Sequence, residues 1–248
     1  IGIDFSVMRT TLAYSMIKSL AYNLIRGNKD FRLFEAGRRY ISKSIPLTER
    51  PDEKNTLCLG ACGENEDFYS FKAIIEELFD IFAINLSFEK EIKPFLHPGR
   101  SASVIADGEK IGYLGEVHPE VSESFDIAAK RLYVAELDLD YIINNAVDLK
   151  NFVPLSKYQS AERDLALIMP KDVLAASVLS AIKAQGGGIL EDARIFDVYE
   201  GGQIPKGKKS VAVKLTFRHL DRTLRDEEVN AVIENVLNSL KDLGAVLR

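Results

Sequence analysis

Polar and aromatic side chains alternate with apolar ones in the stretch 196–199. Asp197 and Tyr199 share one parity, and Phe196 and Val198 share the other. Because successive side chains of a strand point to opposite faces, the pattern predicts an apolar core face and a polar face. A tyrosine ring can stack on a nucleobase, and a carboxylate can accept hydrogen bonds from a base edge. Residue type alone favours commoner roles, a turn-forming carboxylate and a half-buried edge ring.

A second alternating stretch follows a turn rich in glycine and proline at 201–207. One predicted face of this strand is apolar and the other polar, formed respectively by Val211, Val213, Leu215, Phe217 and by Ser210, Lys214, Thr216, Arg218. Seven basic residues but one acid lie between Lys206 and Arg225. This bias fits a surface that meets phosphates, and it also fits a basic loop in solvent.

Length and composition allow one or two globular domains, since the chain has 248 residues and 46% apolar content. The formal net charge of −5 divides unevenly, with +1 from residue 151 onward and −6 before it. Two cysteines, no secretory segment and no apolar run of membrane-spanning length predict a cytoplasmic protein without membrane contact. The chain begins with Ile1, and we expect it to be a piece of a longer protein.

Histidines and cysteines of the first half raise the question of a metal site. His97 and His118 each precede a proline, and Cys58 lies four positions before Cys62 on a predicted strand. This spacing makes a poor zinc chelate, so we favour His-Pro pairs that shape strand ends and predict no metal. The sequence also lacks a recognisable phosphate-binding loop or nucleophile elbow, which argues against an active site here. A small enzyme with a His/Cys site remains a rival hypothesis.

The first half predicts an α+β domain dominated by antiparallel strands. Ser6 is the expected cap of a helix over 7–26, whose apolar residues cover more than one side. That helix is either central to its domain or packed partly on another chain. Further predicted elements are strands at 30–41, 56–63, 86–92, 102–106, 110–116 and 132–137 and helices at 68–83 and 140–145. Asp107-Gly108 predicts a hairpin turn.

The second half, after a predicted linker at 146–155, alternates in the order βαββαβ. Asp172 is the expected cap of its first helix, and Thr223 to Asp226 resembles a capping box before the second. This order predicts a ferredoxin-like sheet with two helices on one face and the other face open. RNA-recognition modules use such a face, and a protein–protein module could use it as well.

Several motifs, in order along nearly the whole chain, resemble the beta-subunit family of bacterial phenylalanyl-tRNA synthetases. They are Met8-Arg9-Thr10-Thr11-Leu12, Arg32-Leu33-Phe34-Glu35, His97-Pro98-Gly99-Arg100-Ser101-Ala102, Gly112 to Pro119, Arg163-Asp164, Phe196-Asp197-Val198-Tyr199-Glu200-Gly201, Lys209-Ser210, Thr223-Leu224 with Glu227, and Leu247-Arg248.

The resemblance implies a C-terminal fragment of the beta subunit. Residues 1–148 would be a class II synthetase core-like domain that is non-catalytic and packs on the catalytic alpha subunit in an (αβ)2 enzyme. Residues 152–248 would be the ferredoxin-fold anticodon-binding domain. The fragment alone would hold no cofactor, whereas the assembled phenylalanine–tRNA ligase would use ATP and Mg²⁺.

The resemblance also implies the residues that bind the anticodon stem-loop of the phenylalanine tRNA. Four of them fall on Asp197, Tyr199, Ser210 and Arg248, and we add the basic residues Lys209, Lys214 and Arg218. A further basic contact of the family corresponds to Leu243, which is a departure and puts that contact in doubt.

Overall fold

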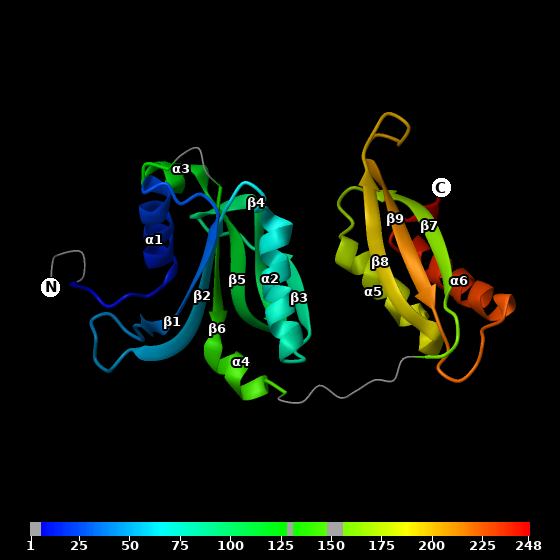
Figure 1. Ribbon diagram of the computed structural model, residues 1–248, viewed down its shortest axis with the longest axis horizontal. Helices are drawn as coiled ribbons and strands as arrows, with labels where there is room; N and C mark the ends of the chain where they lie inside the picture. The colour runs from blue at the N-terminus through cyan, green and yellow to red at the C-terminus, as the bar shows by residue number, and fades with distance from the viewer. Residues whose placement is uncertain (1–5, 128–130, 148–155) are drawn as a thin grey trace. The chain divides into compact units, whose positions relative to one another are not determined.

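A computed structural model describes residues 6–127, 131–147 and 156–248. The chain divides into two compact units, Ile1–Asn151 and Phe152–Arg248 (Figure 1). The linker predicted at 146–155 falls largely on 148–155, which lie outside the described residues. Each unit is therefore described by itself.

The first unit is built on one antiparallel sheet with the strand order β1-β2-β6-β5-β4-β3. Its strands are β1 (Phe31–Ile41), β2 (Asp52–Cys62), β3 (Leu86–Lys90), β4 (Leu96–Ala106), β5 (Glu109–Val117) and β6 (Leu132–Asp138). Strands β2 and β4 begin earlier than predicted, because their outer ends pair with β1 and β5. Asp107 and Gly108 both have positive φ, at 49° and 82°, which confirms the turn between β4 and β5.

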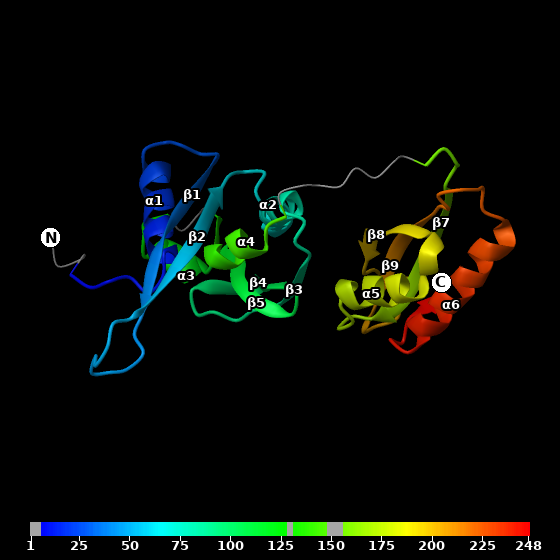
Figure 2. The ribbon, with the colours of Figure 1, turned by 90° about the horizontal axis from the view of Figure 1, so that it is seen from below.

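Helices cover both faces of this sheet, with α1 (Ala13–Ile25) on one side and α2 (Phe68–Ile81) on the other (Figures 1 and 2). Cys58 and Cys62 both lie in the core beneath α1, as their even spacing predicted, and neither forms a disulfide. Two short helices complete the unit, α3 (Pro119–Glu123) after β5 and α4 (Leu139–Asn145) after β6.

Helix α1 starts later than the predicted helix over 7–26, and Ser6 is not its cap. The residue at its N-cap, Leu12, makes no capping bond with its side chain. Instead the carboxylate of Glu136 on β6 accepts the backbone N–H groups of Leu12 and Ala13. A buried acid on the sheet therefore satisfies the helix N-terminus, a long-range contact that no local capping rule reveals.

The second unit has the strand order β10-β7-β9-β8, all antiparallel, which is the ferredoxin-like arrangement that the βαββαβ order predicted. Its elements are β7 (Ala161–Pro170), α5 (Ala175–Gln185), the short helix η2 (Gly187–Ile189), β8 (Leu190–Tyr199), β9 (Lys208–Phe217), α6 (Asp226–Lys241) and β10 (Val246–Leu247). Helices α5 and α6 lie on the same side of the sheet (Figures 1 and 2).

The core of this unit lies between the helices and one face of the sheet. Val178 and Ile182 of α5 and Val236 of α6 pack against Val213 and Leu215 of β9. This confirms the predicted apolar face of β9 and leaves the other face of the sheet uncovered by α5 and α6.

Both predicted helix caps of the second unit differ in the structure. Helix α5 begins after Leu174 without a side-chain cap, so Asp172 does not cap it. Helix α6 has Arg225 at its N-cap, and the carboxylate of Glu228 accepts the Arg225 backbone N–H at 2.9 Å. The box therefore lies two residues later than predicted, with glutamate at its third helical position.

Candidate nucleic-acid interface

Strand register brings the predicted site residues together on the open face in two cross-sheet rows. In the first row Tyr199 of β8 lies opposite Ser210 of β9, which lies opposite Ile168 of β7. Val246 of β10 continues the row beyond Ile168. Directly opposed residues of antiparallel strands have side chains on the same face, so these four share the uncovered side.

The second row contains Asp197 of β8, Ala212 of β9 and Ala166 of β7. Arg248 joins it, because its backbone N–H donates to the carbonyl of Ala166 at 2.8 Å. The two alanines leave a low floor between a carboxylate and a guanidinium. Arg248 also donates from Nη2 to Oε1 of Gln203, 3.2 Å away, in the loop between β8 and β9.

A β-bulge in β8 decides which face Asp197 occupies. Ile195 pairs with Val213 on the core face, but Asp197 pairs with Ala212 on the open face, so Phe196 is the extra residue. Phe196 was predicted to lie on a core wall and is instead 54% exposed. Val198 does lie opposite buried Val211, yet it is 53% exposed, because β8 is an edge strand.

The ring of Tyr199 is half-exposed and lies close to the chain reversal that follows it. A Cβ added to Gly201 would stand 2.0 Å from the Tyr199 hydroxyl oxygen. Glycine is therefore required there for the observed ring position. Ser210 beside it is only 6% exposed, so its hydroxyl lies at the bottom of this surface rather than on its rim.

The basic residues predicted for the site do not lie beside Asp197, Tyr199, Ser210 and Arg248. Lys214 pairs with Glu162 at 3.1 Å, and Arg218 pairs with Glu191 at 2.9 Å. They follow Ser210 on the same strand face by about 13 and 26 Å respectively, at roughly 3.3 Å per residue. The basic bias of 206–225 is thus partly neutralised by acids from other strands, which the count along the sequence does not register.

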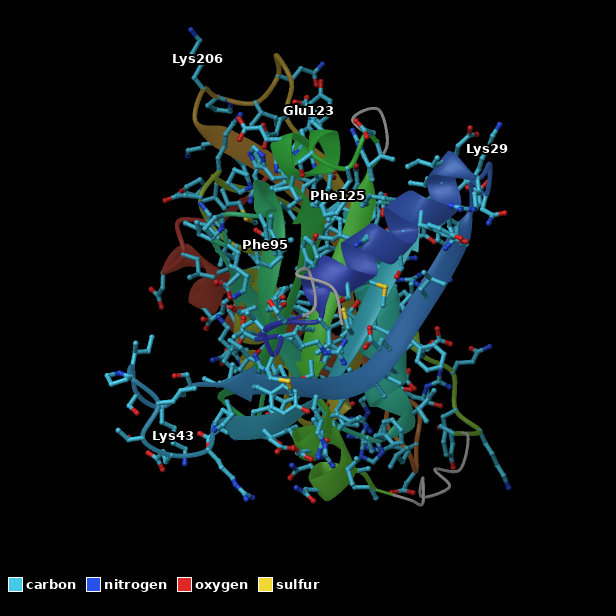
Figure 3. All side chains as sticks on the ribbon, turned by 90° about the vertical axis from the view of Figure 1, so that its left-hand side faces the viewer. Lys29, Lys43, Phe95, Glu123, Phe125 and Lys206 are labelled. Atoms are coloured by element: carbon cyan, nitrogen blue, oxygen red, sulfur yellow. The ribbon has the colours of Figure 1, made fainter. Side chains whose placement is uncertain are left out.

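Lys209 lies on the helix-covered side. It pairs with buried Met169, and its Nζ donates to the carbonyls of Lys171 and Val173 at 3.0 and 2.7 Å. The structure therefore gives Lys209 a structural role near the start of α5. Lys206, by contrast, extends from the tip of the β8–β9 loop (Figure 3).

Sequence reasoning missed several residues of the open face. Ala166 and Ile168 were recoverable, because they alternate with the core residues of β7. Gln203 carried no signal, since its role depends on where the loop meets Arg248.

The histidines of the first unit have local roles. Nδ1 of His118 accepts the Glu120 backbone N–H at 3.3 Å and caps α3 where β5 ends, as its His-Pro pair predicted. Nδ1 of His97 accepts the Gly99 N–H at 3.1 Å near the start of β4. Over 6–127, 131–147 and 156–248 the structure groups no three histidine, cysteine or acidic residues that could hold a metal.

The outer side of α1 exposes large apolar and aromatic side chains among polar ones such as Ser19. Tyr14, Tyr22 and Ile25 are exposed on the helix, and Val7 and Met8 are exposed before it. Part of this surface lines an open groove of about 860 Å³. The inner side packs on the sheet, so the helix is central to its unit and also presents an apolar surface.

A class II-like antiparallel domain joined to a ferredoxin-fold domain with an open polar face is the organisation of an aminoacyl-tRNA synthetase subunit. Residues 1–139 match the family model described as "Phenylalanyl tRNA synthetase beta chain CLM domain", and residues 156–248 match the "Ferredoxin-fold anticodon binding domain". The chain belongs to the phenylalanyl-tRNA synthetase beta-chain family.

Curated relatives agree with this assignment. Phenylalanine–tRNA ligase beta subunits of Clostridium tetani and Clostridium acetobutylicum are 42% and 40% identical, each over 100% of this chain and 31% of the relative. That of Shouchella clausii is 36% identical over 98% of this chain and 32% of the relative. The chain thus spans about a third of the length of these relatives. No helix within the described residues is long and apolar enough to cross a membrane.

Proposed function

We propose that the chain is part of a beta subunit of phenylalanine–tRNA ligase and that its second unit binds the anticodon stem-loop of the phenylalanine tRNA. The observation that carries this proposal is the register that places Asp197, Tyr199 and Arg248 on one uncovered face. Tyr199 stacks on an unpaired base, Asp197 accepts from a base edge, and Arg248 donates to a base or phosphate. Ser210 contributes a hydroxyl at the bottom of the same surface.

Support also comes from the length of the second row, which runs from Asp197 to Arg248. Adjacent strands lie about 4.8 Å apart, so Asp197 and Arg248 are separated by roughly 14 Å across the two alanines. An unstacked base fits flat on such a floor between a hydrogen-bond acceptor and a donor. Lys214 and Arg218, further along the strand, then lie toward the phosphates of the stem.

A gel-shift titration of the full chain tests this proposal. We expect the phenylalanine tRNA to bind more tightly than the same tRNA with a substituted anticodon. We also expect the logarithm of the binding constant to fall steeply with the logarithm of salt concentration, because phosphate contacts release counterions. Equal affinity for both tRNAs would contradict anticodon recognition.

The first unit, in this proposal, packs on the catalytic alpha subunit in an (αβ)2 assembly. The apolar outer side of α1 and its groove support this role, since exposed aromatic patches of this kind mark protein interfaces. ATP and Mg²⁺ would be bound by the assembled enzyme, which joins phenylalanine to its tRNA. The two buried cysteines, which form no disulfide, fit a cytoplasmic location.

The alternative is a protein–protein module that uses the open sheet face, and the exposed Val246 on that face favours it. This alternative predicts tRNA binding that is weak and nearly independent of salt. The same salt titration therefore separates the two functions.

A further inference from the structure

One lysine of the open face has no role so far, and it borders the first cross-sheet row, which contains Tyr199 and Ser210. Lys208 is the first residue of β9 and pairs with Pro170, the last residue of β7. It precedes Ser210 by two residues, so its side chain leaves the strand on the same uncovered face. At roughly 3.3 Å per residue, the two positions are about 7 Å apart. Lys208 therefore lies beside the row, on the side of the β8–β9 loop.

The ring of Tyr199 leans toward this lysine. The register of β8 and β9 ends at the pair Tyr199 and Ser210, and two further residues on each strand would set Gly201 opposite Lys208. The Tyr199 hydroxyl lies at Gly201, because a Cβ added there would stand 2.0 Å from its oxygen. The half-exposed ring and the lysine therefore share one end of the open face. A base stacked on the ring carries its sugar and phosphate to one side, so a cation at this end can meet them.

The backbone around Lys208 is held on both sides. The Lys208 N–H donates to the carbonyl of Pro205 at 3.0 Å, and the carbonyl of Gly207 accepts the N–H of Lys171 at 3.0 Å. Ile204 of the same loop is only 8% exposed, which anchors the loop to the unit. Lys208 is thus presented from a fixed backbone, which reduces the conformational entropy that binding would cost.

Lys208 also differs from Lys214, a lysine on the same face of β9, in having no acid beside it. The Lys214 ammonium lies 3.1 Å from Glu162 and 3.9 Å from Asp164. Among the residues that the structure describes, no carboxylate lies within ion-pair distance of the Lys208 ammonium. Asp197, the acid of the second row, is two rows away, about 13 Å along the strands. The charge of Lys208 is therefore available to a ligand on the open face.

The end of the sheet around Lys208 carries a surplus of positive charge. Segments 170–173 and 199–209 form this end and have a net charge of +2, from the lysines Lys171, Lys206, Lys208 and Lys209 and the acids Asp172 and Glu200. Glu200 pairs with Lys171 at 2.6 Å, and Asp172 lies between the two residues whose carbonyls bind Lys209. The end of α6, which reaches Pro170 through Gly244, adds one charge of each sign, from Lys241 and Asp242. The surplus therefore belongs to Lys206 and Lys208, and Lys208 is the one on the open face.

We propose that the Lys208 ammonium binds a phosphate of the RNA strand whose base stacks on Tyr199. This inference rests on the proposed function of the second unit and adds the path of the sugar–phosphate backbone, which passes over the loop end of the open face. An ammonium is a compact point charge, which suits a phosphate. Phosphate contacts position the RNA without reading its sequence, so Lys208 adds affinity while Asp197 and Arg248 discriminate between bases.

Gel-shift titrations of Lys208→Gln in the full chain test this inference, at several salt concentrations, with the phenylalanine tRNA and with the same tRNA carrying a substituted anticodon. We expect the affinity for both tRNAs to fall by the same factor, roughly two- to fivefold, because one exposed charge contact is lost. We also expect the slope of the logarithm of the binding constant against the logarithm of salt to become shallower by roughly 0.7–0.9. Lys208→Arg keeps the charge and should retain the slope of the wild type.

Lys183→Gln is the matched control, because Lys183 is an exposed lysine of α5, which covers the opposite face of the sheet. It removes the same charge from the chain and should leave the slope unchanged. A slope in Lys208→Gln no shallower than in this control would overturn the inference. A loss of affinity for one tRNA alone would overturn it too, since Lys208 would then read a base. Equal affinity of the wild type for the two tRNAs would instead contradict anticodon recognition, because a phosphate contact alters the slope with either tRNA.

Discussion

The carboxylate of Glu136 accepts a hydrogen bond from the backbone N–H of Ala13 at 3.0 Å, although 123 residues separate the two in the chain. The side chain is 4% exposed, and its second oxygen accepts from the Tyr113 hydroxyl at 2.7 Å. Burial, followed by the charge of Glu136, raises the pKa of Tyr113 far above its usual value. One acid thus joins the start of α1, β6 and β5.

Glu136→Gln should destabilise the first unit by about 2–4 kcal/mol, because the carboxylate accepts from four donors through two oxygens, whereas an amide has a single acceptor oxygen. Urea unfolding of the full chain, followed by a probe of the first unit, measures this. Glu89→Gln, at an exposed position on β3, is the control and should change the free energy of unfolding by less than about 0.5 kcal/mol. A loss no larger than that of the control would contradict the role of Glu136.

Gly201→Ala should weaken tRNA binding without unfolding the protein. The new methyl group would overlap the hydroxyl end of the Tyr199 ring, which can swing away because it is the far end of a half-exposed side chain. Losing one base stack of ~1–3 kcal/mol corresponds to a fall in affinity of roughly 5- to 150-fold. Gly202→Ala is the matched control, since a Cβ there meets nothing within 4 Å. Equal affinities of the two variants in a gel-shift titration would argue against stacking by Tyr199.

Tyr199→Ala should lower tRNA affinity by a similar factor in the assembled enzyme and leave ATP-dependent phenylalanine activation intact. The reason is that, in the proposed function, the open face binds RNA and takes no part in ATP binding. Filter binding and pyrophosphate exchange measure the two quantities separately. Tyr69→Ala, at an exposed tyrosine of the first unit, serves as the control. Unchanged tRNA binding in Tyr199→Ala would remove the main support for the proposed face.

Lys209→Met should leave tRNA affinity and its salt dependence unchanged, because the Lys209 ammonium is bound to two carbonyls near the start of α5. It should cost about 1.5–3 kcal/mol of stability, the range for hydrogen bonds that involve a charged group. Lys214→Met provides the comparison and should reduce the salt dependence of tRNA binding. A lower salt slope in Lys209→Met would show that the residue reaches RNA after all.

Stability in acid should depend on Glu228. Hydrogen bonds from Arg222 and then from the Arg225 backbone lower the pKa of Glu228 to about 2 from 4.5. A depressed pKa stabilises the fold fully above the unfolded value, and this contribution is lost as the pH falls from about 4.5 toward 2. Glu228→Gln should therefore differ from the wild type at pH 6 and converge with it near pH 2 in urea unfolding. Glu234→Gln, exposed on the same helix, should differ at neither pH.

Turn signals and the order of the elements were enough to predict the antiparallel sheets, and the alternation of apolar residues predicted the shared face of Asp197 and Tyr199. That alternation was not enough to predict the bulge at Phe196, which leaves Ile195 on the core face and Asp197 on the open face. A bulge depends on how the partner strand pairs around one extra residue, and the sequence of one strand alone does not determine that pairing.

The parts that sequence reasoning missed depend on contacts between distant segments. The start of α1 is set by Glu136, which lies on a strand more than a hundred residues later. The basic stretch looked unpaired because its acids, Glu162 and Glu191, come from other strands. In each case the deciding partner is distant in sequence, so local patterns could not place it.

Strand β10 is the shortest in the second unit, Val246–Leu247, and it joins the sheet through β7 alone. Arg248 directly follows this strand, and its side chain donates a hydrogen bond to Gln203 of the β8–β9 loop. The backbone amides of Val246 to Arg248 should therefore exchange with deuterium faster than those of β7 or β9. An RNA held by Arg248 would retard that exchange, so the slow-down itself would report occupancy of the site.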